Sequence, residues 1–210
     1  MAIEARGRAR AGARRLNAVT PLHFCDVTVD GALWPVFGWA IDGPVGTILV
    51  DTGMIDSTPS LDEGWGPVLR PWPELGAVVA VINTHLHFDH CGGNRRFAGT
   101  PIYVQRAELE AAVEPGYLEE WVRFPGADYV ELDGDAQLAD GVSVLFTPGH
   151  SPGHQAVVVE TDEGSVVLAG DVTYSMRELI GGATESIRRI HDLRPVRVYL
   201  AHHERPWEPG

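Results

Sequence analysis

Short apolar runs recur along most of the chain, and each run ends at glycine, proline or a polar residue. Runs of this length that are rich in valine and isoleucine are typical of buried strands. They predict strands at residues 23–29, 34–41, 47–50, 78–83, 102–104, 142–146, 156–160, 165–169 and 196–200. Helical patterns separate some of these runs, at residues 93–97, 107–112, 118–124 and 183–192. Strand-rich halves with interposed helices favour two mixed sheets packed as a sandwich and flanked by helices, an α/β (α+β) fold.

One segment, residues 56–74, breaks the pattern. It is rich in proline and contains Trp65 and Trp72, which together indicate a long irregular insert of the kind that often forms a pocket wall. The two tryptophans either line an acyl or aromatic pocket or anchor the loop, and the sequence leaves both interpretations open.

The length and composition are those of one domain with a real core. The chain has 210 residues, of which 44% are hydrophobic. No apolar run approaches the roughly 18 residues that a membrane span needs, so no membrane partner is expected. Residues 1–20 are rich in arginine and lack the apolar stretch of a secretory signal, which predicts a flexible arm before a folded domain at residues 21–210.

Charge and cysteine content limit the binding partners and the cellular location that we expect. The formal net charge is −13, so the body of the protein would repel phosphate and nucleic-acid binding is not expected. Cys25 and Cys91 are too few for a disulfide framework, which favours a reducing, cytoplasmic location. The oligomeric state stays open, a homodimer included.

A cluster of metal-ligand residues follows the apolar run 78–83. His85, His87, Asp89 and His90 fall within six positions, where a solvated polar face would not be expected. Imidazole and carboxylate are the ligands that zinc prefers in sites without thiolates. Because one turn can direct alternate side chains at different ions, the spacing suggests two metals.

Further candidate ligands lie beyond other predicted strands. His150 and His154 stand in a turn rich in proline and glycine after strand 142–146, and Asp171 follows strand 165–169. His202 and His203 follow the last strand, and as neighbours they point in opposite directions, so only one can easily reach a shared site.

These motifs, in this order, resemble the metallo-β-lactamase superfamily over roughly residues 22–208. The resemblance implies the αββα sandwich of that family. It also implies two divalent metal ions, zinc first, with manganese, cobalt or ferrous iron as alternatives. The implied residues are the following: for one metal His85, His87 and His150; for the second Asp89, His90 and His202; as the bridge Asp171; and as supports of the ligands Asp51 and His154.

The position of Tyr174 favours one branch of the superfamily. The spacing of Asp171 and Tyr174 is similar to that of the N-acyl homoserine lactone lactonases, as is the sequence around residues 87–94. The resemblance implies a quorum-quenching hydrolase that opens small-molecule esters or lactones with a metal-bridging hydroxide. In that reaction Tyr174 would stabilise the oxyanion and Asp89 would protonate the leaving group. Tyr174 as a mere packing residue is the simpler alternative.

Two other activities remain open at the level of sequence. A thioesterase like glyoxalase II generally adds a helical domain after the last ligand, whereas this chain ends at residue 210. A persulfide dioxygenase would hold one iron through two histidines and one aspartate. Metal analysis separates these readings from a dinuclear lactonase, and so does a panel of lactone, thioester and β-lactam substrates. A metal-binding module without catalysis is a further alternative.

Overall fold

The computed structural model describes residue 3 and residues 17–43 and 46–209. Most of the predicted arm at residues 1–20 lies outside this range, so its flexibility stays a prediction. Its predicted end is wrong, because strand β1 begins at Ala18 and pairs with β2 from that residue onward. The first predicted strand therefore starts five positions earlier than its apolar pattern suggests, at residue 18 instead of residue 23.

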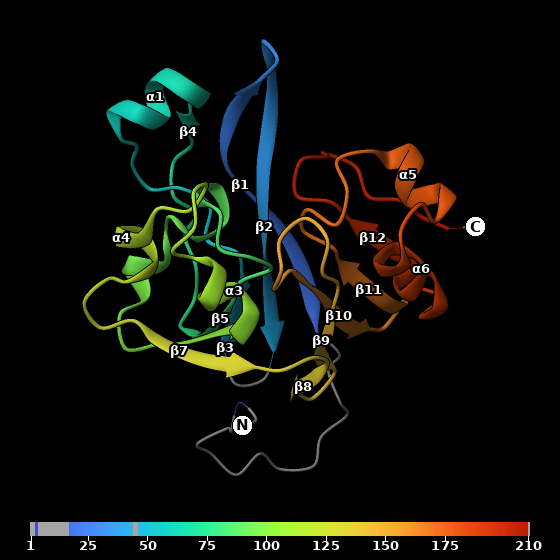
Figure 1. Cartoon of the computed structure of the whole chain (residues 1–210). Helices are drawn as coiled ribbons and strands as arrows, with labels where there is room; N and C mark the ends of the chain where they lie inside the picture. Colours follow the sequence, from blue (N-terminus) through green and yellow to red (C-terminus); the bar gives the residue numbers. More distant parts are fainter. Residues whose placement is uncertain (1–2, 4–16, 44–45, 210) are drawn as a thin grey trace.

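Two mixed sheets form the centre of the molecule (Figure 1). The larger has the strand order β4-β1-β2-β3-β5-β6-β7 and the smaller β12-β11-β10-β9-β8. The strands of the larger sheet are β1 (Ala18–Val29), β2 (Ala32–Gly43), β3 (Gly46–Val50), β4 (Val68–Leu69), β5 (Val78–Ile82), β6 (Pro101–Gln105) and β7 (Asp128–Leu132). Those of the smaller sheet are β8 (Ala136–Ala139), β9 (Val142–Phe146), β10 (Gln155–Thr161), β11 (Gly164–Leu168) and β12 (Arg197–Tyr199).

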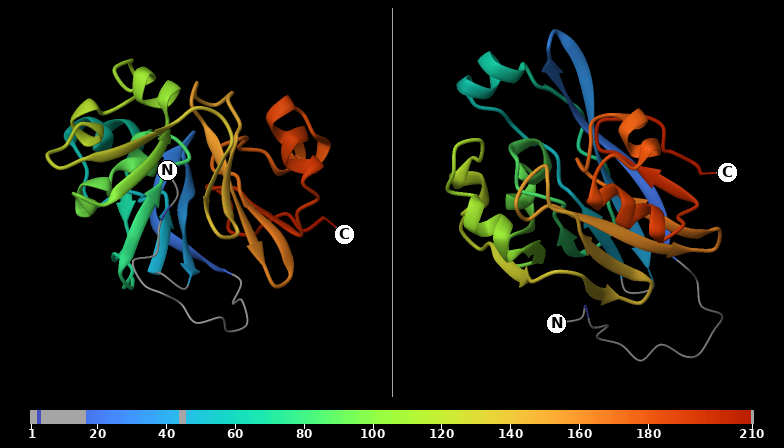
Figure 2. Two further views of the ribbon diagram at one scale, coloured as in Figure 1. Left: turned by 90° about the horizontal axis from the view of Figure 1, so that it is seen from below. Right: turned by 45° about the vertical axis from the view of Figure 1, so that its right-hand side comes forward.

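Helices cover the outer faces of both sheets (Figure 2). The helices are α1 (Pro59–Trp65), α2 (Phe88–Cys91), α3 (Arg106–Ala111), α4 (Glu119–Val122), α5 (Met176–Gly181) and α6 (Glu185–Asp192), with a short 3-10 helix at Asn94–Phe97. α3 and α4 lie beside the larger sheet, and α5 and α6 lie beside the smaller one (Figures 1 and 2). The predicted αββα sandwich is confirmed. Among the described residues, no helix has the length and apolar character needed to cross a membrane.

The facing sides of the two sheets form the main core. Trp39 and Ile82 from the larger sheet pack with Val157 and Leu168 from the smaller one, and all four are fully buried. Burying a side chain of this size contributes roughly 1.5–3 kcal/mol relative to leaving it exposed. Apolar packing therefore holds the sheets together and fixes where their strand ends lie.

The sequence pattern missed several short elements. Residues 56–74 are not irregular throughout, because α1 and β4 lie within them; Thr58 caps α1 by accepting a hydrogen bond from the main-chain N–H of Leu61. The helix predicted at 118–124 is shorter than expected because Phe124 precedes a proline, which disfavours helical geometry. Strands β7 and β8 were also missed, since few β-branched residues mark them.

The turn after β3 depends on one glycine. Gly53 has a left-handed φ of 55°, and a Cβ atom there would lie 2.2 Å from Cβ of Phe24. No L-residue with a side chain fits this position without moving the larger sheet.

Replacing Gly53 with alanine should therefore destabilise the protein by at least about 2 kcal/mol, the combined effect of overpacking and left-handed strain. Urea denaturation measures the free energy of unfolding. The matched control is Gly64→Ala in α1, where a Cβ would meet nothing within 4 Å. The control should be neutral or slightly stabilising. Equal stabilities for the two variants would contradict the packing argument.

Candidate metal centre

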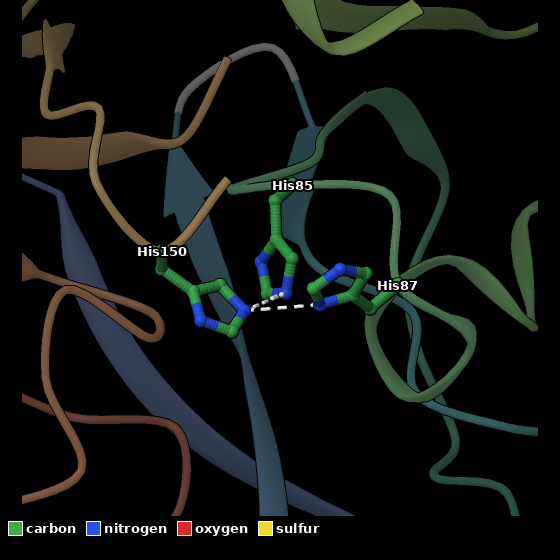
Figure 3. Close-up of side chains that lie close together, drawn as sticks. All are labelled: His85, His87 and His150. Carbon is green, nitrogen blue, oxygen red and sulfur yellow. Dashed lines mark hydrogen bonds between the residues drawn. The ribbon is translucent and has the colours of Figure 1, made fainter. Parts of the chain in front are cut away.

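Three imidazoles from two loops meet at one point (Figure 3). His85 and His87 follow β5, and His150 follows β9. His150 Nε2 lies 3.1 Å from His85 Nε2 and 2.9 Å from His87 Nδ1. Ligands held at 2.0–2.1 Å around a tetrahedral zinc ion are about 3.3 Å apart. The three nitrogens thus have nearly the spacing of ligands to a single ion.

A second group lies beside the first. Asp89 and His90 belong to α2, and His202 follows β12. Oδ2 of Asp89 is 3.7 Å from His90 Nε2 and 3.6 Å from His202 Nε2. The ligand atoms of these residues all lie within 4.8 Å of one another, as do those of the first group.

Asp171, just beyond β11, lies between the two groups. Its Oδ2 is 3.6 Å from His150 Nε2 and 3.2 Å from His202 Nε2, and its Oδ1 is 3.5 Å from His90 Nε2. One carboxylate therefore faces nitrogens of both groups, as a bridging ligand would.

Two atoms at this point are left unsatisfied by the protein. His90 Nε2 and Asp171 Oδ1 are buried and have no hydrogen-bond partner among the described residues. A buried polar atom without a partner costs about 1–3 kcal/mol. A divalent cation would satisfy both atoms, and the set of imidazoles and carboxylates suits such an ion. The residues present therefore fit divalent metal ions.

Hydrogen bonds orient the imidazoles. Nδ1 of His90 lies 2.9 Å from Asp51 Oδ2, and Nδ1 of His202 lies 2.9 Å from the carbonyl oxygen of Pro35. Both partners only accept, so Nδ1 carries a proton in each ring and Nε2 is the nitrogen that faces the site. Side-chain orientation is thus set before any ion binds.

Asp51 supports the loop that carries most of these residues. This buried aspartate has a left-handed φ of 55° and accepts hydrogen bonds from N–H and Oγ1–H of Thr84, at 2.7 and 2.8 Å. Left-handed geometry is unfavourable for a non-glycine residue, so several strong contacts must hold it. Through Thr84 and His90, Asp51 thus links the start of this loop to α2.

The remaining histidines of the motifs have other contacts. His154 is fully buried; its Nδ1–H donates to the carbonyl of Thr147, and its Nε2 accepts from the main-chain N–H of Asp171. It therefore fixes the backbone of Asp171 and does not face either group. His203 Nε2 lies 2.9 Å from the carbonyl oxygen of Tyr174, so the structure brings His202 to the site and not His203.

Burial and charge set the protonation of the site. Burial lowers the pKa of His150 to about 4 and holds the pKa of His85 well below its usual range, so both rings are neutral and able to bind metal at pH 7. Burial also lowers the pKa of His90, but attraction to Asp171, Asp89 and Asp51 outweighs burial and raises it overall. The carboxylates thus favour positive charge at the place where a metal ion would lie.

A cavity of about 310 Å³ opens onto both groups. Asp89, Asp171 and Tyr174 line its polar end. Its wall is apolar and includes Trp34 and Trp65.

The sequence left open whether the two tryptophans of the 56–74 segment line a pocket or anchor the loop, and the structure shows one in each position. Trp65 lines the cavity, whereas the ring of Trp72 packs 4.9 Å from Phe24 and anchors the loop. Sequence reasoning gave no role to Trp34, which lies within the predicted strand 34–41, or to Glu108, which lies within the predicted helix 107–112. No motif marks either residue.

A layered sandwich with histidine and aspartate groups at its strand ends is typical of metal-binding proteins. Comparison of the sequence with known protein families identifies the family. The model of the "Metallo-beta-lactamase superfamily" matches residues 31–208. The chain belongs to this superfamily.

Individual relatives point to one branch. The chain is 40% identical over 163 residues to an N-acyl homoserine lactonase of Bacillus cereus, a match that covers 67% of this chain and 65% of that protein. It is 28% identical to N-acyl homoserine lactonase AttM of Agrobacterium fabrum, covering 81% and 79%. A crystal structure of a B. thuringiensis AiiA mutant with N-decanoyl-L-homoserine bound at its active site superimposes with a TM-score of 0.76 at 30% identity, covering 90% of this chain and 93% of that one.

Replacing Asp51 with asparagine should weaken metal retention. The amide keeps the shape but loses an acceptor for Thr84 or His90, and changes of this kind typically cost 10- to 100-fold in metal affinity. Metal content after dialysis against a graded chelator series measures the effect. Asp56→Asn, which removes the same charge from an exposed pair with Arg95, is the control and should retain metal like the parent protein. Equal loss from both variants would mean that Asp51 acts only through net charge.

Proposed function

We propose that this protein is a dinuclear metal-dependent hydrolase that opens the ring of N-acyl homoserine lactones. The observation that carries the proposal is that Asp171 lies between two ligand groups and lines a largely apolar cavity. The similarity to N-acyl homoserine lactonases supports the lactone as substrate. So does the N-decanoyl-L-homoserine in the AiiA mutant, since that molecule is an opened lactone.

In this proposal His85, His87 and His150 would hold one ion, Asp89, His90 and His202 would hold the other, and Asp171 would contribute to both. Zinc is the first choice, because nitrogen and carboxylate ligands at this spacing suit it. A pair of such cations would polarise an ester carbonyl and lower the pKa of a shared water toward roughly 7.

Tyr174 has the geometry of a hydrogen-bond donor to the substrate. Its phenol oxygen lies 3.2 Å from Nδ1 of His150. When Nε2 of His150 faces the ligand group, Nδ1 carries the proton and donates it to the phenol oxygen. The hydroxyl proton of Tyr174 is then free to stabilise charge that develops on the substrate carbonyl oxygen. Burial raises the pKa of Tyr174, which keeps this proton in place at neutral pH.

Asp89 is placed to return a proton to the leaving group. Its carboxylate lines the cavity and lies beside His90 and His202 at the second group. Ring opening leaves an alkoxide that is still tethered to the acyl part of the substrate. A carboxylate at this position would accept the proton that the attacking water loses and pass it to that alkoxide as a general acid.

The apolar wall suits the acyl part of the substrate. The apolar part of the cavity lining consists of Val27, Val29, Trp34, Trp65 and Phe88. Apolar area removed from water contributes about 25 cal/mol per Å² to binding before the costs of ordering are subtracted. The cavity therefore favours acylated lactones over the free lactone ring.

A substrate panel tests the proposal directly. Zinc-reconstituted protein is assayed with N-acyl homoserine lactones, thioesters, β-lactams and a persulfide, under the same conditions. Hydrolysis of the lactones with the highest kcat/KM supports the proposal. Faster thioester cleavage without lactone opening would assign the protein to thioester hydrolysis, and oxygen uptake with the persulfide in iron-loaded protein would assign it to oxidation.

Replacing Tyr174 with phenylalanine should lower kcat for lactones while metal content stays unchanged. One lost donor to a developing oxyanion costs about 1–3 kcal/mol of transition-state stabilisation. Steady-state kinetics and elemental analysis give both readouts. Tyr129→Phe, which removes a hydroxyl bonded to the carbonyl of Val122, is the control and should keep kcat. Unchanged turnover in Tyr174→Phe would reduce Tyr174 to a packing residue.

Replacing Asp171 with asparagine should lower activity by at least about a hundredfold. The amide removes the negative charge that offsets two dications, and this exceeds the 10- to 100-fold losses typical of residues that only support ligands. Lactone turnover and metal-to-protein ratio are measured together. Full activity with two bound ions in this variant would refute the bridging role.

A further inference from the structure

Glu108 is a fully buried acid on α3 that has no part in the proposed reaction. Its carboxylate accepts hydrogen bonds from two sides. Oε1 accepts from N–H of Leu86 at 2.9 Å and from the hydroxyl of Tyr117 at 3.0 Å. Oε2 accepts from the hydroxyl of Ser151 at 2.6 Å and from N–H of Gly153 at 2.9 Å. Every one of these partners donates, and a carboxylate, which has only acceptor atoms when ionised, satisfies them together.

These donors belong to the two loops that carry the first ligand group. Leu86 lies between His85 and His87, and Ser151 directly follows His150. One side chain on α3 therefore joins the loop after β5 to the loop after β9. These two loops carry the three imidazoles that meet in Figure 3.

The approach of the second loop to α3 is unusually close. A Cβ atom on Gly153 would lie 2.2 Å from the main-chain nitrogen of Glu108, so only glycine fits there. Tyr117 adds a second link, because its ring centroid lies 5.0 Å from that of His87 while its hydroxyl donates to Glu108. Main-chain and hydroxyl donors thus converge on Glu108, and Tyr117 connects it to the ring of His87.

The second ligand group has different supports. His90 is oriented by Asp51, and His202 is oriented by the carbonyl of Pro35. Neither contact involves Glu108. A change at Glu108 should therefore act on one ligand group and spare the other.

We propose that Glu108 is a positioning residue that selectively sets the geometry of the metal position formed by His85, His87 and His150. It acts through the main chain and side chains of the two loops and touches neither ion nor substrate. This inference rests on the metal assignment of the proposed function, so its test must also show whether that assignment holds.

The test compares Glu108→Gln with Glu110→Gln, a matched control on the same helix whose carboxylate is exposed. A glutamine at position 108 turns an NH2 group toward two of the donors and leaves them unsatisfied. Metal-free protein is titrated with Zn²⁺ by calorimetry and with Co²⁺ by visible absorption. Glu108→Gln should weaken one of two binding steps by at least about tenfold and alter the Co²⁺ spectrum of that step only. Glu110→Gln should match the parent protein.

Other outcomes are distinguishable. Two unchanged steps in Glu108→Gln, or equal weakening of both steps, would overturn the positioning role while leaving the dinuclear assignment intact. A parent protein that binds a single ion would overturn the dinuclear assignment itself. If Glu108→Gln does not fold, Tyr117→Phe removes one donor and keeps the ring; weakening confined to one step supports the inference, and an unchanged titration overturns it.

Discussion

The site depends on buried carboxylates that accept hydrogen bonds from the surrounding loops and so hold these loops in place. Lone pairs of several imidazoles and of Asp171 converge at the strand ends, an arrangement that is repulsive unless a cation lies among them. Asp51 holds Thr84 and His90 on one side, and Glu108 holds the loops after β5 and β9 on the other. The apolar core fixes the positions of the strands, and Asp51 and Glu108 fix the loops that follow the strand ends.

The same division separates buried supporting residues from residues that line the cavity. Asp51, His154 and Glu108 are buried and bonded to main-chain or ring donors, whereas Asp89 and Tyr174 line the cavity. A group that faces the cavity can exchange a proton with a substrate, and the residues bonded to that group determine which of its atoms carries the proton. For example, the tautomer of His150 decides whether the Tyr174 hydroxyl is free to donate a hydrogen bond.

The sequence predicted the long apolar strands and the ligand motifs, because both are local signals. Valine-rich runs such as 156–160 mark buried strands wherever they occur, and the histidine-rich turn after β5 has little other explanation. It could not predict β7, α1 within the 56–74 segment, or the role of Glu108. β7 is stabilised by pairing with β6, and Glu108 gains its role from donors that are 22 and 43 positions away along the chain. Such contacts exist only after the sheets have packed.

The central claim is that the fold presents two metal positions that share Asp171. Anomalous diffraction from crystals of the zinc-reconstituted protein measures this directly. The account predicts two peaks per chain about 3.5–4 Å apart, one among His85, His87 and His150 and the other among Asp89, His90 and His202. A single peak in protein reconstituted with excess zinc, or two peaks that Asp171 does not join, would contradict it.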